Sequence, residues 1–154
     1  MRTALLICIA LLLPVFAGGA IAEQPEPPRF VSVGGQEIPV GKTGVTEVIF
    51  TARWCRPCEK VLSEARRRAA QLRRSGFRVV VVGTPLRETK AEFVAWAKQH
   101  GFSSGLVFDG GGALGSRYGA ERIPYHVVIG PGGKVLYSGF DAPPVPQIRK
   151  WLSK

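Results

Sequence analysis

Residues 45–58 read VTEVIFTARWCRPC, and this stretch decides the fold and most of the chemistry. Its first seven residues form an apolar run typical of a buried strand. Two cysteines spaced three apart follow, at the start of a helical pattern over 55–75 that ends before Gly76. On a helix, residues at this spacing have Cβ atoms about 5–6 Å apart, close to the range of a disulfide.

Cys55 is the predicted attacking sulfur of this pair. A thiol in the first helical turn feels the positive end of the helix dipole, which favours the reactive thiolate. Arg56 adds a cation beside it, and Pro57 shapes the first turn. We therefore expect an exposed, ionised Cys55, with Cys58 resolving the mixed disulfide that Cys55 forms.

From about Phe30 to its C-terminus, the chain resembles the thioredoxin superfamily, and within it the exported TlpA/ResA-like thiol-disulfide oxidoreductases. The resemblance rests on residues 48–55, on the RIPY element at 122–125 and on the glycine-rich stretch 109–119. It implies an α/β, thioredoxin-like fold: a mixed central sheet flanked by helices, with an N-terminal hairpin and a central insertion. The chemistry it implies is that of a thiol:disulfide oxidoreductase.

The same resemblance implies the surroundings of the cysteines. Pro124 is expected to be cis, to face the pair and to exclude metal ions. Ile123 and Tyr125 are expected to line the surface where a partner docks, with Trp54 flanking the sulfurs.

Residue patterns along the chain predict the same order of elements. We expect a hairpin of 30–33 with 36–40, a strand at 77–82, a helix from the capping box at 89–92 to about residue 100, a strand at 106–108, a helix at 113–118, a hairpin of 125–129 with 134–139, and a terminal helix at 146–152.

The first 22 residues predict a signal peptide. Arg2 precedes an apolar run over 4–16, and small residues follow. Residues 23–29 are proline-rich and predicted to be a disordered lead-in to a domain spanning 30–154. We expect a periplasmic or otherwise extracytoplasmic protein, with an uncleaved membrane anchor as the alternative.

The chain carries a formal net charge of +10, concentrated at Arg66–Arg68 and at Arg73–Arg74. The favoured interpretation is a solvated helix face. An anionic membrane surface or acidic partner proteins are the alternatives, whereas no nucleic-acid-binding motif accompanies the charge. We expect no metal and no cofactor.

The chain departs from the family in how it would handle protons. Thioredoxins carry a buried Asp six residues before the first cysteine, where this chain has Ile49, and TlpA/ResA-like proteins often carry a Glu where it has Val61. Water, Glu59 or His126 must then accept the proton of Cys58. His126 is also open to a plain packing role in a strand.

By resemblance, the partners would be exported proteins with disulfides or thiols, such as apocytochromes c, and a membrane-bound electron donor. A reductase is favoured over a dithiol oxidase. Two further hypotheses are a copper-handling module that uses Cys55, Cys58 and His126, and a docking domain whose disulfide never cycles. A peroxidase is less favoured.

Overall fold

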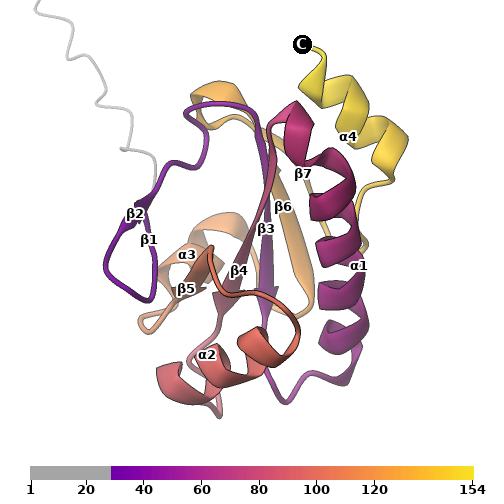
Figure 1. Ribbon diagram of the computed structural model, residues 1–154. Coiled ribbons are helices and arrows are strands. Elements are labelled where there is room, and N and C mark those ends of the chain that lie inside the picture. The colour runs from indigo at the N-terminus through magenta and orange to yellow at the C-terminus, as the bar shows by residue number, and fades with distance from the viewer. Residues whose placement is uncertain (1–28) are drawn as a thin grey trace, which may run out of the picture.

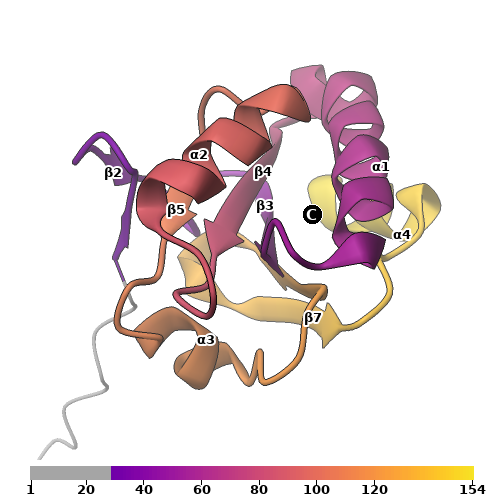
Figure 2. The same ribbon diagram turned by 90° about the horizontal axis from the view of Figure 1, so that it is seen from below.

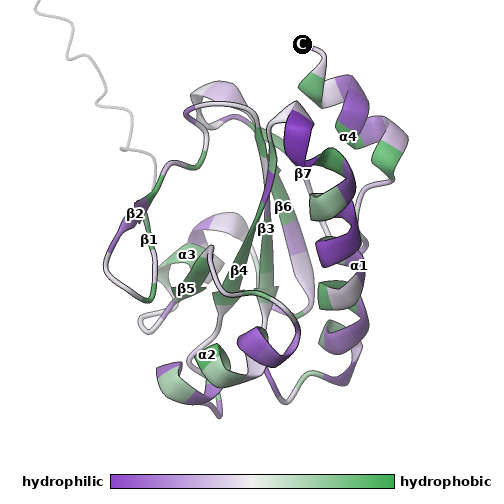
Figure 3. Cartoon of the chain, in the orientation of Figure 1, coloured by the Kyte–Doolittle hydropathy of each residue, from purple (hydrophilic) through white to green (hydrophobic). Residues whose placement is uncertain are grey.

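The computed structural model describes residues 29–154, and it centres on strand β3, Val45–Thr51, whose seven residues are all buried. β3 pairs in parallel with β4, Phe77–Gly83, and antiparallel with β6, Tyr125–Ile129. A strand covered on both faces needs apolar side chains in both directions, which explains why these segments are mostly apolar (Figure 3).

Five strands form the main sheet in the order β5-β4-β3-β6-β7, with β5 at Leu106–Phe108 and β7 at Val135–Gly139. β3, β4 and β5 are parallel, whereas β6 and β7 run antiparallel to their neighbours (Figure 1). The mixed sheet flanked by helices confirms the expected thioredoxin-like fold.

Helices cover both faces of this sheet (Figure 2). One face packs against α1, Arg56–Leu72, and α2, Lys90–Gln99, and at its far end against α4, Val145–Leu152. The other face packs against α3, Ala113–Tyr118, and against Phe30 of the small hairpin formed by β1, Phe30–Val31, and β2, Glu37–Ile38. The cysteines lie on the α1 face.

The ends of α1 follow from its sequence. Cys55 is the N-cap and a proline occupies the first turn, where its missing N–H costs nothing. The α-helix ends at Leu72 rather than at 75, because the next three residues form the 3-10 turn η1, Arg73–Ser75. Gly76 then takes a left-handed conformation, with φ 84°, that reverses the chain.

The buried stripe of α1 contains one charged residue. It consists of Cys58, Leu62, Ala65, Arg68 and Leu72. The interpretation of 66–68 as a solvated face is therefore wrong at Arg68, which turns inward because a buried carboxylate on β3 neutralises it, while Arg66 and Arg67 remain exposed.

The remaining elements follow the predictions closely. The capping box of α2 is present, since the Thr89 hydroxyl accepts from the Glu92 amide and the Glu92 carboxylate accepts from the Thr89 amide. The connection within the predicted hairpin of 125–129 with 134–139 is a 3-10 turn, η2, Pro131–Gly133, and the strands of the first hairpin are shorter than predicted. The predicted signal peptide and most of the lead-in lie outside the described residues. Within residues 29–154, none of the helices has the length and apolarity to cross a membrane.

Candidate functional site: a disulfide at the start of α1

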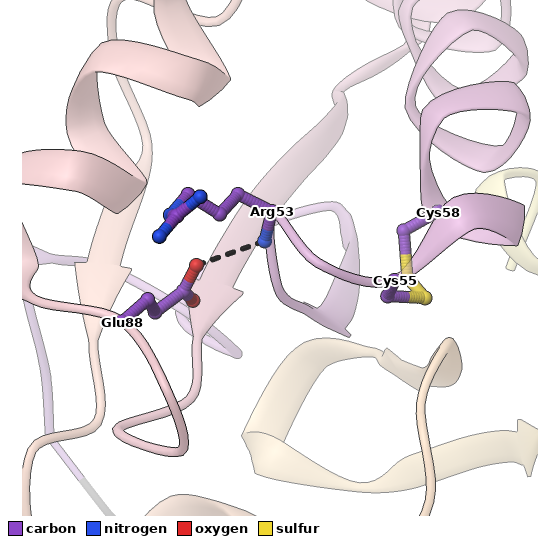
Figure 4. Close-up of a disulfide and its surroundings, with 4 residues drawn as sticks. All are labelled: Arg53, Cys55, Cys58 and Glu88. Atoms are coloured by element: carbon purple, nitrogen blue, oxygen red, sulfur yellow. Dashed lines mark hydrogen bonds between the residues drawn. A yellow bond between two sulfur atoms is a disulfide. The ribbon is translucent and has the colours of Figure 1, made fainter.

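Cys55 and Cys58 form a disulfide at the N-terminus of α1, with their Cα atoms 5.4 Å apart (Figure 4). β3 delivers the chain to this point through the short segment 52–54, and α1 begins directly after Cys55. Reduction of this bond would leave the Cys55 thiolate at the positive end of a helix of 17 residues, where its charge is stabilised.

The two sulfurs are enclosed to different extents. Cys55 is 5% exposed and Cys58 is fully buried, and both pack in one apolar cluster with Ile49 and Leu62. The expectation of an exposed sulfur is therefore wrong for the oxidised form, because the apolar cluster covers most of Cys55. The difference in exposure still fits Cys55 as the attacking sulfur and Cys58 as the resolving one, since only Cys55 presents any surface to a partner.

A loop after β4 braces the segment that carries the cysteines. The Trp54 indole N–H donates to the Leu86 carbonyl at 2.6 Å. The Arg53 amide donates to Glu88 Oε2 at 2.8 Å (Figure 4). The Arg53 guanidinium reaches Glu92 of α2 at 2.9 Å, so three contacts hold residues 53–54 against the loop and α2.

Glu88 accepts one of these three contacts, the hydrogen bond from the Arg53 amide. The side chain is 8% exposed, and its Oε1 has no hydrogen-bond partner within residues 29–154. Burial raises the pKa of Glu88, against the Arg53 amide hydrogen bond and the Arg53 charge, which lower it. Figure 4 shows its carboxylate turned to the Arg53 backbone, with Arg53 between it and the disulfide.

Pro124 lies directly before β6. The Ile123–Pro124 peptide bond is cis. Ile123 is half-buried and packs against the cluster that holds both cysteines. Tyr125 is also half-buried, with its ring edge-on to Phe140 at 5.3 Å between centroids.

A groove of about 520 Å³ lies beside this site. Trp54 and Ile123 belong to its wall, whereas Tyr125 does not. Trp54 is 40% exposed and Leu86 is 59% exposed, so apolar surface remains uncovered next to the disulfide. Arg122 and Glu121 add charge of both signs to the wall.

A charged cluster lies buried on the same face of the sheet. Glu47 Oε1 accepts from the Arg68 guanidinium at 2.7 Å and lies 2.8 Å from His126 Nδ1. Glu47 Oε2 accepts a second bond from Arg68 at 3.2 Å, and Glu47 and His126 are both fully buried. Burial alone would raise the pKa of Glu47, but the hydrogen bond with His126 and the charge of Arg68 outweigh it and hold the pKa below its ordinary value.

The structure separates the predicted modulating residues. Arg56, Pro57 and Glu59 are exposed on the first turn of α1, and Glu59 lies on the surface with Arg53 and Glu92. His126 is buried, as a packed strand histidine would be, but its ring is bonded to Glu47. Across residues 29–154, no three His, Cys, Asp or Glu side chains are arranged to hold a metal ion.

Sequence reasoning missed the roles of Glu47, Arg68 and Glu88. A signal for the first two was present: Glu47 interrupts an apolar strand, and Arg68 lies ten residues after Cys58, on the same helical stripe. Glu88 carries no such signal, because its burial depends on the fold of a loop.

Known proteins resemble this chain in fold. The family model described as AhpC/TSA family matches residues 40–138. Among solved structures, a candidate thiol:disulfide interchange protein DsbE from Chlorobium tepidum is 24% identical with a TM-score of 0.69, covering 82% of this chain and 94% of that one. StoA from Bacillus subtilis is 22% identical with a TM-score of 0.65, covering 81% and 96%.

A third structure is a secreted Mycobacterium tuberculosis disulfide oxidoreductase homologous to E. coli DsbE. It is 14% identical with a TM-score of 0.65, covering 82% of this chain and 95% of that one. None of the curated proteins matches the chain.

Proposed function

Because this chain belongs to the AhpC/TSA family and is a thioredoxin-like thiol:disulfide oxidoreductase, we propose that it reduces disulfides in other exported proteins. The observation that carries the proposal is a disulfide that begins a helix beside an uncovered apolar groove. A structural staple is disfavoured, since a bond across two intervening residues removes little chain entropy from the unfolded state.

The reduced pair would act in two steps. The Cys55 thiolate attacks one sulfur of a partner disulfide, whose other sulfur leaves as a thiolate. Cys58 then attacks Cys55, so that the Cys55–Cys58 bond forms and the partner is released with both sulfurs reduced. Two electrons pass from this protein to the partner, and a membrane-bound donor restores the dithiol.

The groove beside Trp54 and Ile123 supports docking of an extended apolar segment of the partner. Tyr125 would contribute from outside the groove. Apocytochromes c are the proposed substrates, since they must present reduced cysteines. Export rests on the predicted signal peptide at 1–22, and the fold shared with a secreted disulfide oxidoreductase is consistent with it.

Trapping in the native host tests this proposal. In Cys58→Ser the first step proceeds and the second cannot, so partners should accumulate covalently on Cys55. Cys55→Ser, which retains one cysteine of the pair, is the matched control and should capture none. Recovery of no exported protein on Cys58→Ser would refute the reductase function.

The direction of electron flow is tested by the reduction potential of the pair. A reductase should lie near thioredoxin, at about −270 mV, whereas the strong oxidant DsbA lies at about −120 mV. Equilibration of the protein with glutathione and dithiothreitol buffers measures this value. A potential near that of DsbA would favour the dithiol oxidase.

Four exposed arginines support a further contact, with an anionic membrane surface: Arg66 and Arg67 of α1, and Arg73 and Arg74 of η1. They lie toward the end of α1 opposite the cysteines, because 17 helical residues span about 25 Å. The redox end would then stay free for partners. Co-sedimentation with phosphatidylglycerol vesicles at low salt should be lost in Arg73→Gln/Arg74→Gln, and absence of wild-type binding would refute the contact.

A further inference from the structure

His126 is bonded to Glu47 of the buried Glu47–Arg68 pair, and it lies on the face of the sheet that α1 and the cysteines cover. Side chains alternate along a strand, so Glu47, Ile49 and Thr51 share the face that α1 covers. His126 is the register partner of Ile49, which packs in one cluster with Cys55 and Cys58. The Cα of His126 therefore lies one step nearer than that of Glu47 to the end of β3 that leads to the cysteines, and one same-face step along the chain from Pro124.

Glu47 decides which nitrogen of the ring carries hydrogen. An ionised carboxylate can only accept, so His126 Nδ1 must donate to Glu47 Oε1 across their 2.8 Å separation. The neutral ring then keeps a bare lone pair on Nε2. Nε2 is buried and has no hydrogen-bond partner among residues 29–154. Thr51 Oγ1, one step nearer the cysteines on the same face, likewise lacks a partner there.

The other groups around His126 are poor proton acceptors. On β7 its register partner is Gly139, over which the Tyr137 phenol lies, since a Cβ there would be 2.6 Å from the phenol oxygen. Burial raises the pKa of Tyr137, so the phenol stays neutral and its hydroxyl donates to the Asp141 carbonyl. Of the buried residues on α1, Cys58 and Arg68 carry polar or ionisable groups, and Arg68 is bonded to Glu47, while the buried residue of α4 is Ile148. A fully buried acceptor without a partner is costly, which indicates that Nε2 serves a purpose other than packing.

We propose that His126 Nε2 takes the proton of the Cys58 thiol when Cys58 resolves the mixed disulfide, and that Glu47 and Arg68 are positioning residues for the ring. The inference rests on the proposed dithiol chemistry and deepens it. The Cys58 S–H bond breaks, the proton passes to Nε2, and the thiolate attacks Cys55, so that the Cys55–Cys58 bond forms and the Cys55–partner bond breaks. The partner sulfur leaves as a thiolate. When a donor reduces the pair again, Cys58 leaves as a thiolate and recovers the proton from the imidazolium.

A small aromatic disulfide, 5,5′-dithiobis(2-nitrobenzoate), separates the two steps, because each step releases one coloured thiolate. In His126→Asn the amide N–H can still donate to Glu47, but no nitrogen can accept a proton. At pH 7 the second release should be about 100-fold slower than in wild type, while the first is unchanged. The deficit should shrink as pH rises, because Cys58 then ionises without help. His100→Asn, at the end of α2, is the matched control and should behave as wild type.

Two outcomes would overturn the proposal. One is a second step in His126→Asn with the rate and pH profile of wild type. The other is an equal slowing of both steps, which would assign His126 to packing alone.

The wild-type protein gives an independent measurement should His126→Asn fail to fold. In ¹⁵N-labelled protein, the Nε2 resonance of His126 should respond to pH differently in the oxidised and reduced states, whereas His100 should respond alike in both. Identical behaviour of His126 in the two states would contradict proton exchange with Cys58.

Together, the release kinetics of His126→Asn and the trapping by Cys58→Ser distinguish failure of this inference from failure of the proposed function. If His126→Asn is slowed as expected but Cys58→Ser captures no exported protein, the reductase function fails and the proton route stands. If partners are captured and His126→Asn resolves normally, only the proton route fails.

Discussion

Arg68 is the cation that makes a carboxylate tolerable inside the interface between β3 and α1. Its guanidinium makes two hydrogen bonds to Glu47, one to each oxygen, in the forked geometry that arginine favours. Replacement by an apolar side chain would leave Glu47 buried with its charge uncompensated. We expect Arg68→Met to lower the free energy of unfolding by about 3–5 kcal/mol, measured by urea denaturation.

The neighbouring residue provides the control for that experiment. Arg67 is exposed on the same helix, so Arg67→Met should change the free energy of unfolding by no more than about 0.5 kcal/mol. Arg68→Lys keeps the charge but loses the two-pronged hydrogen bonding. Its loss in free energy of unfolding should therefore lie between those of Arg68→Met and Arg67→Met. Equal effects of Arg68→Met and Arg67→Met would show that the buried pair does not stabilise the fold.

Glu88 has the opposite electrostatic character to Glu47. Its pKa is raised in the folded protein, so its favourable contribution is complete below the ordinary value of 4.5 and is lost as pH rises through the raised value. Glu88→Gln keeps an oxygen that accepts from the Arg53 amide and removes the buried charge. We expect Glu88→Gln to gain stability relative to wild type between pH 4 and pH 7.

Urea denaturation across that pH range measures the effect, with Glu59→Gln as the control at an exposed position. A difference between Glu88→Gln and wild type that does not vary with pH would contradict the raised pKa.

At the scale of elements, α2 holds the segment that leads to the cysteines through one ion pair, between Arg53 and Glu92. Glu92 is also the third residue of the helix and closes the capping box with Thr89. Thr89→Ala should therefore lower the free energy of unfolding by about 1 kcal/mol. It should also free the Glu92 carboxylate from the Thr89 hydroxyl, which shares Oε2 with the Thr89 amide.

Thermal denaturation of Thr89→Ala measures this loss, and Ser63→Ala, at an exposed site on α1, is the control. A loss no larger than that of Ser63→Ala would show that the capping box does not stabilise the folded protein.

Most elements could be predicted because their determinants are local. The apolar run of β3, the capping box before α2 and the glycine after η1 each fix a segment without reference to the rest of the chain. The pairing of Glu47 with Arg68 and His126 is different, because it joins β3, α1 and β6, and only the register of the sheet brings them together. Cys55, Cys58 and Pro124 could be found from their motifs, whereas the enclosure of Cys55 depends on how α1 packs.

For the whole molecule, acid stability depends on several carboxylates whose pKa values shift in opposite directions on folding. The pKa of Glu47 is lowered in the folded state, so its contribution is present above 4.5 and is lost as pH falls through the lowered value. Glu92 acts in the same direction, through its hydrogen bonds with Thr89, and Glu88 in the opposite one. We expect the free energy of unfolding to fall below pH 4.5 by up to about 1.4 kcal/mol per pH unit from Glu47 alone.

Glu47→Gln isolates this contribution. It removes the titrating group and retains hydrogen-bonding atoms toward Arg68 and His126, so the variant should be less stable than wild type at pH 7. The difference between the two proteins should shrink as pH falls below 4.5, because wild type then protonates the same side chain. Glu121→Gln, at an exposed position, is the control, and the difference between its free energy of unfolding and that of wild type should stay constant over the same pH range. A constant gap between Glu47→Gln and wild type from pH 7 to pH 3 would show that the pKa of Glu47 is the same in the folded and unfolded protein, and would contradict the lowered pKa that the bonds with His126 and Arg68 imply.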